Sequence, residues 1–460
     1  MSSPIIERAS AADMMELASA TTPAAAQIGA ILILTPAGVD LGAVRSALAD
    51  RIVGVRRLRQ RLQRTPIGCG RPIWIDDPTF DVVNHVNEIV CPPPGDRRAL
   101  LGIVADLVGR RLPPERPLWS ATLITGLDED AAALVLIFHH VLADGMGGLA
   151  VLANLVDDAP TPPACEFPRD RPRTTSLIAN VMRARFHSVV HLPNSVRGLR
   201  DAAAELGANS RKARAPRCSL NRPVGSRRCL AVVHSRLHEI HTAAGEHGAT
   251  INDASLAAIT GALTRYLHQR HEDVGHLVLS IPVSNRTAAT ADRLGNQVGV
   301  MLVVAPVTTG TAGDRLEAMA ASTRVRKHAQ RGASAELLVP VLRFLAAIRV
   351  LKFMTRHQRI ATTFVTNLRG PEHHLGFLDA TVSEIIPVNG TSGNVRVGFG
   401  VFSYAGTLTI TLVADSELAG DLPELAALLQ HELDELCDSA VGGHLGAIPE
   451  RLDVSGTGQR

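Results

Sequence analysis

The sequence predicts an α/β fold, because short apolar runs typical of buried strands alternate with longer segments of helical periodicity. The chain has 460 residues, of which 46% are hydrophobic and 20% are charged, so it can bury large cores. Aromatic residues make up only 3% of the chain, so we expect an aliphatic core. Base-stacking platforms of the kind that bind nucleic acids are not expected.

The first half of the chain alternates strands and helices. Its longest signal is residues 131–138, a run of eight apolar residues that suits a buried strand. Shorter apolar runs at 28–34 and 120–125 predict two further strands, and periodic segments at 41–62, 98–111 and 149–155 predict helices.

The second half repeats this pattern without repeating the sequence. We expect strands at 232–237, 276–283, 299–306, 362–366, 395–403 and 407–414, and helices at 238–245, 254–269, 313–330 and 423–437. Apolar and polar residues alternate in 395–403 and 407–414, which predicts that these two strands have one face in solvent.

The middle of the chain is rich in proline and then in arginine. Residues 169–228 contain 14 Lys and Arg against three acids, a net charge of +11, and include a helix-like segment at 177–206. This segment is either a solvated basic face or a site for phosphates of a bound molecule or for anionic lipid. We predict domains at 1–168 and 230–460, joined by a basic linker at 169–229.

Other segments bear on the location of the protein. The six cysteines form no C-x-x-C pair, and acidic residues precede the first apolar run, so we expect a reduced, cytoplasmic chain without a secretory signal. The uncharged runs are too interrupted for a membrane-spanning helix. Residues 336–354 are apolar and basic, and predict either a core helix or a segment lying in a membrane interface.

Two histidines, His139 and His140, follow the long strand, and Asp144 and Gly145 come shortly after. The histidines could be core residues, metal ligands or a general base. Adjacent residues of a strand point to opposite faces, which disfavours one metal ion bound by both. A histidine has an ordinary pKa of about 6.5, so it can take a proton from a hydroxyl at neutral pH. Asp144 can cap the following helix, and if buried it needs a cationic partner.

The complete string H-H-x-x-x-D-G resembles the signature of the CoA-dependent acyltransferase superfamily. Other segments resemble, in order, motifs of the bacterial wax ester synthase/diacylglycerol acyltransferase family. They are Pro117-Leu118-Trp119, Leu220–Arg228, Asn252-Asp253-Ala254-Ser255-Leu256-Ala257, Pro282–Arg286 with Leu294-Gly295-Asn296, Thr366–Pro371 and Ser403–Gly406. The resemblance spans about residues 10–440. One motif departs from the family: where P-M-H-x-G is usual, this chain has Ala25-Ala26-Gln27-Ile28-Gly29.

The resemblance implies two domains like chloramphenicol acetyltransferase, with mixed sheets, flanking helices and an active-site channel between them. It implies transfer of a long-chain acyl group from acyl-CoA to diacylglycerol, and also to long-chain alcohols. The alternatives are another hydroxyl lipid or polyketide alcohol as acceptor, or a catalytically weak lipid-binding paralogue. No cofactor, metal or nucleic acid is expected, and acyl-CoA is a co-substrate. The protein is expected to associate peripherally with the inner face of the membrane or with lipid droplets.

The resemblance also assigns roles to residues. His140 is expected to be the general base, and His139 to be structural. Asp144 is expected to hold the loop before Gly145 by pairing with Arg286. Asn252, Asp253 and Ser284 are supporting residues, and the donor to the oxyanion is expected among Ser284, Asn252 and Ser403. Arginines of the basic linker are expected near the CoA phosphates.

Overall fold

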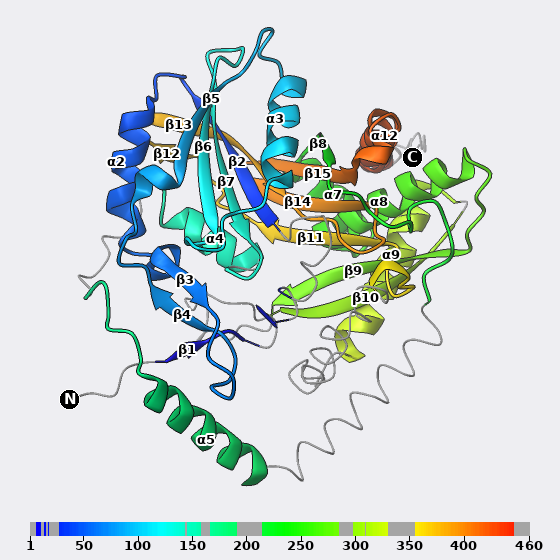
Figure 1. The fold of residues 1–460 in the computed structure, drawn as a ribbon. Coiled ribbons are helices and arrows are strands. Elements are labelled where there is room, and N and C mark those ends of the chain that lie inside the picture. The colour runs from blue at the N-terminus through cyan, green and yellow to red at the C-terminus, as the bar shows by residue number, and fades with distance from the viewer. Residues whose placement is uncertain are drawn as a thin grey trace, which may run out of the picture.

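The computed structural model describes residues 6–10, 13, 14, 17, 27–142, 145–157, 166–190, 214–284, 298–308, 310–329 and 355–445. Two six-stranded sheets and one three-stranded sheet form its framework (Figure 1). Helices flank both large sheets, and each of these sheets contains parallel and antiparallel pairs. The predicted α/β class is therefore confirmed.

The first sheet carries the long buried strand near its centre. Its order is β12-β13-β2-β7-β6-β5, and only β5 and β6 are parallel. The strands are β2 (Gln27–Thr35), β5 (Val86–Val90), β6 (Trp119–Thr125), β7 (Ala132–His139), β12 (Leu375–Phe377) and β13 (Ala380–Val388). Helices α2 (Leu41–Ile52) and α4 (Gly145–Ala153) lie over one face of the sheet, and α3 (Arg97–Gly109) lies over the other.

The second sheet has the order β10-β9-β11-β14-β15-β8. Its strands are β8 (Arg228–Arg236), β9 (His276–Ser284), β10 (Val298–Pro306), β11 (Thr363–Arg369), β14 (Val397–Tyr404) and β15 (Thr407–Asp415). Four helices pack together on one of its faces around a large aliphatic core. They are α7 (Leu237–Glu246), α8 (Ile251–His268), α9 (Ala312–Ala329) and α12 (Leu422–Leu445).

The two large sheets are joined by strands that exchange between them. After β11 the chain enters the first sheet as β12 and β13, and then returns to the second sheet as β14. Tyr404, at the end of β14, fixes this exchange: its hydroxyl donates to the Val382 carbonyl (2.8 Å) and accepts from the Leu375 N–H (2.7 Å). The domain boundaries at 168 and 230 remain a prediction. The sheets are not divided at these positions, because strands within 375–388 belong to the first sheet.

This exchange corrects one expectation. The prediction that 395–403 and 407–414 have a solvated face is wrong, because nearly every residue of β14 and β15 is buried. Phe402 and Tyr404 pack into the core of the first sheet, and Val413 packs with residues of α3. The second face of these strands is therefore covered by the first half of the protein.

A small sheet with the order β1-β4-β3 lies beside the first sheet. It comprises β1 (Glu7–Arg8), β3 (Gln60–Gln63) and β4 (Ile73–Asp76), and helix α5 (Thr174–Val190) packs on it. The predicted helix over 41–62 is wrong in its second half: α2 ends at Ile52, and after Gly54 a 3-10 turn (Arg56–Arg59) leads into β3. Gly54 explains the break, since glycine is a poor helix former.

Several predicted segments lie outside the described residues, namely 336–354, 191–213 and the loop around Asp144. Within the part of the chain that the structure describes, no helix combines the length and the apolar character needed to cross a bilayer.

Candidate active site

The histidine pair lies where β7 leaves the first sheet. Even-numbered residues of β7 pack on the side of α2 and odd-numbered residues on the side of α3. His139 is the last residue of the strand, and its N–H donates to the Leu118 carbonyl at 2.9 Å. The Leu142 N–H then donates back to the His139 carbonyl at 2.8 Å, which closes a turn around His140. Both histidines are half-buried.

The ring of His139 is held by its own backbone turn. Its Nδ1 accepts the N–H of Val141 at 3.1 Å, so the ring proton is on Nε2. Burial, and to a lesser extent the neighbouring His140, lower the pKa of His139 to about 4. His139 is therefore neutral and fixed in orientation at physiological pH, which suits the structural role expected of it.

The segment Pro117–Trp119 supports the histidine pair from β6. Besides the bond from His139 to Leu118, Trp119 is almost completely buried and its indole N–H donates to the Leu58 carbonyl at 2.7 Å. Its ring stacks on His85 with a centroid distance of 4.5 Å and an interplanar angle of 12°. These contacts place the segment in the framework behind the site.

The helix that follows the His140 turn contacts the second sheet. Helix α4 begins at Gly145, as the motif predicts a helix after the loop, and it packs against β11 of the second sheet. Asp144 and Arg286 lie outside the described residues, so their pairing stays a prediction. Ser284 ends β9, where its backbone pairs with Val298.

Asn252 and Asp253 lie in the first turn of helix α8. Thr250 is the N-cap, and Asp253 completes a capping box by accepting from the Thr250 N–H (3.0 Å) and hydroxyl (2.7 Å). The other carboxylate oxygen of Asp253 accepts from the Thr323 hydroxyl at 2.7 Å, which ties α8 to α9. Both carboxylate oxygens of the buried Asp253 therefore have structural partners, and its role is to cap α8 and to join it to α9.

Asn252 points toward the second sheet instead. Its Oδ1 accepts from the Nδ2 of Asn367 on β11 at 3.1 Å. Ser403 is in the adjacent strand β14, where it is the register partner of Arg369 of β11. The Ser403 carbonyl accepts the Gly370 N–H at 2.8 Å. Three segments singled out from the sequence, around residues 252, 367 and 403, therefore meet at β11, the strand that α4 contacts.

Comparison with known proteins identifies the family. The family model described as "Wax ester synthase/diacylglycerol acyltransferase catalytic domain" matches residues 10–255, and that of the WS/DGAT C-terminal domain matches residues 294–437. The chain belongs to this acyltransferase family. It is 30% identical to the probable diacylglycerol O-acyltransferase tgs1 of Mycobacterium tuberculosis over 414 residues, which cover 87% of this chain and 88% of that protein.

Solved structures share the fold of this acyltransferase. The wax ester synthase/diacylglycerol acyltransferase from Marinobacter aquaeolei VT8 is 22% identical, with a TM-score of 0.68, and the match covers 95% of this chain and 100% of that chain. The first condensation domain of the CDA synthetase is 17% identical, with a TM-score of 0.62, over 95% of this chain and 98% of that chain. The expected two-domain fold with mixed sheets is thereby confirmed.

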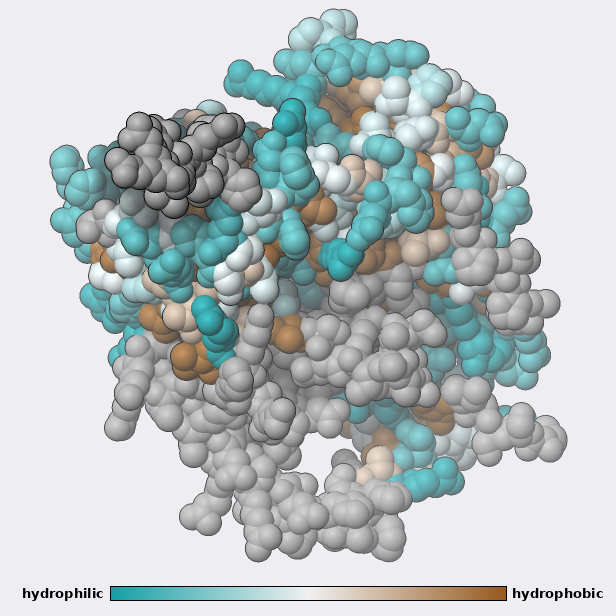
Figure 2. All heavy atoms as spheres, turned by 180° about the vertical axis from the view of Figure 1, so that it is seen from behind, coloured by the Kyte–Doolittle hydropathy of each residue, from teal (hydrophilic) through white to brown (hydrophobic). Residues whose placement is uncertain are grey.

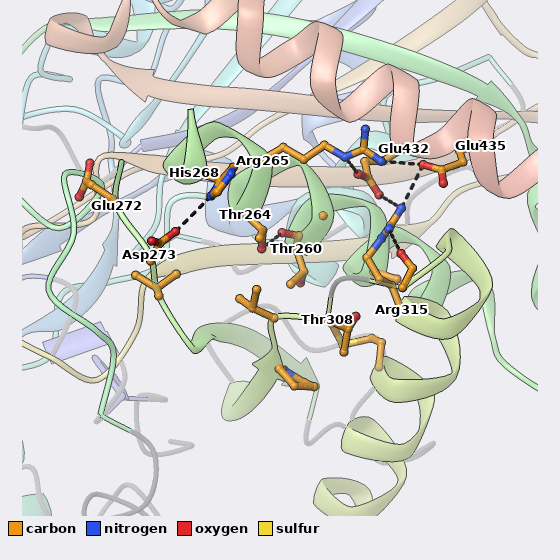
Figure 3. Close-up of a pocket in the computed structure, with 17 residues that line it drawn as sticks. Thr260, Thr264, Arg265, His268, Glu272, Asp273, Thr308, Arg315, Glu432 and Glu435 are labelled. Atoms are coloured by element: carbon orange, nitrogen blue, oxygen red, sulfur yellow. Dashed lines mark hydrogen bonds and ion pairs between the residues drawn. The ribbon is translucent and has the colours of Figure 1, made fainter. Parts of the chain in front are cut away.

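A cavity of about 520 Å³ lies in the helical layer of the acyltransferase's second sheet (Figure 3). Arg265 and Arg315 point into it, but both are paired with Glu432 (2.6 and 2.7 Å) and Glu435 (2.8 and 3.1 Å). The α8 residues that line it run from Ala257 to His268, which lie about 8 to 24 Å along the helix from Asn252 at 1.5 Å per residue. None of the residues that line this cavity is one of the predicted site residues.

Gln27 occupies the position where the family motif has histidine, and the structure shows why this position matters. Gln27 is the register partner of His139 in the antiparallel pair β2–β7, so the two side chains share one face of the sheet. It is 1% exposed, and its amide N–H donates to the Arg110 carbonyl at 2.7 Å. Gly29 of the motif is retained, because a Cβ there would lie 2.3 Å from the Leu136 carbonyl oxygen.

The contacts of Gln27, Asn367 and Tyr404 were missed as site features by reasoning from the sequence. Each residue does lie in a motif that the sequence shows. Gln27 replaces the histidine of P-M-H-x-G, Asn367 belongs to the T-N-x-x-G-P segment, and Tyr404 belongs to the S-Y-x-G segment. Their significance depends on which strands are neighbours, and only the fold provides that information.

Proposed function

We propose that this acyltransferase moves a long-chain acyl group from acyl-CoA to diacylglycerol, and also accepts long-chain alcohols. The observation that carries the proposal is the difference in environment between the two histidines. His139 is neutral and bound to its own turn, whereas the half-buried His140 is the next residue, in the turn that leads to α4, and α4 contacts β11 of the second sheet. The name of tgs1, which is similar over most of this chain, supports diacylglycerol as the acceptor.

In the proposed reaction, His140 takes the proton of the acceptor hydroxyl as its oxygen attacks the thioester carbonyl. The tetrahedral intermediate collapses by breaking the carbon–sulfur bond, and the departing CoA thiolate receives the proton from the same imidazole. The new ester bond replaces the thioester, so no covalent acyl-enzyme is required. A general base contributes about 10²–10⁴-fold to such a step, and positioning of both substrates in one channel contributes the rest.

The oxyanion of the intermediate needs a hydrogen-bond donor. Asn252, Ser284 and Ser403 remain the proposed candidates. The bond from Asn367 to the Oδ1 of Asn252 favours Asn252, because it leaves the Nδ2 of Asn252 as the donating group and fixes its direction. Asn252→Ala should then lower kcat by about 10²–10³-fold, whereas Ser403→Ala should lower it less.

We also propose that the enzyme works at the inner face of the membrane or on lipid droplets, attached peripherally. Diacylglycerol and its product are confined to lipid phases, so the acceptor side of the channel must open to one.

The acceptor is tested by release of CoA thiol from palmitoyl-CoA. Purified protein is given dioleoylglycerol, hexadecanol, monooleoylglycerol or no acceptor, and the lipid products are separated. We expect the fastest release with dioleoylglycerol, slower release with hexadecanol, and a small background without acceptor. Release that is equal with and without acceptor would contradict the proposal, because it would indicate thioester hydrolysis. No release with any acceptor would favour a lipid-binding paralogue.

A further inference from the structure

Helix α5 has an apolar row that nothing in the described structure covers. Leu177 and Val181 face the small sheet: Leu177 is 4% exposed, and it packs with Ile73 and Ile75 of β4. Ile178 and Met182, one position further round the helix, are 42% and 58% exposed. Their four-residue spacing places them on one face. Among the described residues, the helix therefore has an inner apolar row that anchors it and an outer apolar row that is exposed.

The turn between β3 and β4, which lies against α5, adds a third exposed apolar residue. Cys69 N–H donates to the Pro66 carbonyl at 3.0 Å, and Ile67 at the tip is fully exposed. The turn is adjacent to α5, since a Cβ on Gly70 would lie 2.8 Å from a methyl group of Val181. Ile67, Ile178 and Met182, named here the α5 face, are three of the eight large hydrophobic residues exposed among the described residues.

The side chain of Arg8 holds the two parts of the α5 face together. Its Nη1 donates to the carbonyls of Cys69 (2.9 Å) and Arg71 (3.0 Å) in the turn. Its Nη2 and Nε donate to the Leu177 carbonyl (3.2 Å) and to Asn180 Oδ1 (2.8 Å) in α5. The face is thus fixed before any ligand binds, and binding need not order it.

The two segments that form the α5 face carry charge of one sign. Residues 60–72 and 174–190 together contain five arginines and no acidic residue. Among them, Arg64 and Arg183 are exposed. Apolar side chains surrounded by arginine are typical of surfaces that enter the headgroup layer of an anionic membrane. Two copies of this face would instead repel each other.

We propose that the α5 face docks the enzyme on an anionic phospholipid surface, with Ile67, Ile178 and Met182 entering the headgroup layer and the arginines meeting lipid phosphates. Membrane docking itself does not depend on the proposed function. Only the purpose that we give it, access to diacylglycerol, rests on that function. In the view from behind, the 180° turn brings α5 to the lower right, where a small group of brown and teal residues lies side by side (Figure 2). Strand β5, which ends at Val90, lies at the opposite end of the molecule from α5 (Figure 1), so Val90 can serve as a control position.

Flotation with vesicles tests the proposal. The vesicles contain equal parts of phosphatidylcholine and phosphatidylglycerol, with or without dioleoylglycerol. The variant I67S/I178S/M182S removes the apolar side chains, and V90S/V325S/I360S is the matched control, because these residues are 70%, 70% and 58% exposed elsewhere. We expect the partition coefficient of the first variant to fall by about tenfold or more, and that of the control to stay within about twofold of wild type. Binding of the wild type should also weaken at high salt.

Equal binding by both triple variants would overturn the proposal. So would a change of oligomeric state in I67S/I178S/M182S, measured by light scattering, without loss of vesicle binding, because the face would then be an interface between copies. Failure of the proposed function gives a different result: vesicle binding would follow the predicted pattern while dioleoylglycerol is not acylated. His140→Ala should float like wild type.

Discussion

Arg97, Glu384 and His234 form an ion cluster, the 97–384–234 clasp, that joins three elements. Arg97 begins α3, Glu384 lies on β13, and His234 lies on β8 of the second sheet. Glu384 Oε1 accepts from Arg97 Nη1 at 3.1 Å and lies 2.6 Å from His234 Nε2, and its Oε2 pairs with Arg97 Nη2. The clasp therefore holds the first half of the protein against the second sheet.

The pKa of Glu384 gives the magnitude of this contact. Burial opposes ionisation of the carboxylate, but the hydrogen bonds and charges of His234 and Arg97 outweigh it, so the pKa falls from 4.5 to about 2. That difference corresponds to about 3 kcal/mol at about 1.4 kcal/mol per pKa unit. The Arg97 and His234 side chains are 46% and 36% exposed, so solvent screening reduces the expected contribution to about 1–2 kcal/mol.

Glu384→Gln keeps the size of the side chain and removes its charge. We expect the free energy of unfolding at pH 7, from urea titration followed by circular dichroism, to fall by about 1–2 kcal/mol. Because the folded pKa lies below the unfolded one, the stabilisation is complete above about pH 5 and is lost as the pH falls toward 2. The gap between wild type and variant should therefore narrow on acidification.

A matched control is Glu372→Gln, since Glu372 is 75% exposed and, among the described residues, its ion pair is with Arg369 three positions before it. It should change stability by less than about 0.5 kcal/mol. The reasoning is refuted if Glu384→Gln is as stable as wild type at pH 7, or if its loss of stability is the same at pH 7 and pH 3.

Three further substitutions test particular contacts. Tyr404→Phe removes the buried hydroxyl that donates to Val382, and should destabilise the protein by about 1–3 kcal/mol in urea titrations. Gly261→Ala places a Cβ 2.2 Å from the Glu432 carboxylate and should lower the unfolding midpoint, by an overpacking cost of about 1–3 kcal/mol. Gln27→His restores the family residue beside the histidine pair. It should change the ratio of the kcat/KM values for diacylglycerol and hexadecanol by more than about twofold. An unchanged ratio would exclude Gln27 from acceptor selection.

Local sequence patterns predicted most elements of this fold. The uncharged run before His139 became β7, and the capping residues around Thr250 and Asp253 began α8, because strand burial and helix capping depend on a few neighbouring residues. The helix expected over 41–62 failed only beyond Ile52, where Gly54 allowed the chain to turn.

Long-range pairing could not be predicted in this way. β12 and β13 follow β11 in sequence but pair in the first sheet, so β14 and β15 are covered on the face expected to be solvated. The same limit applies to the site. Motifs selected His139, His140, Asn252 and Ser403, but the contact of Asn252 with Asn367 depends on which strands are neighbours.

The central claim is that His140, and not His139, transfers the proton. The most direct measurement compares dioleoylglycerol-dependent CoA release by wild type, His140→Ala and His139→Asn. Asparagine at 139 offers an oxygen to the Val141 N–H in place of the ring nitrogen. We predict that His140→Ala lowers kcat by about 10²–10⁴-fold with little change in KM, while folded His139→Asn keeps at least about a tenth of the wild-type kcat. Comparable activity of His140→Ala and wild type, or a greater loss in His139→Asn, would contradict the account.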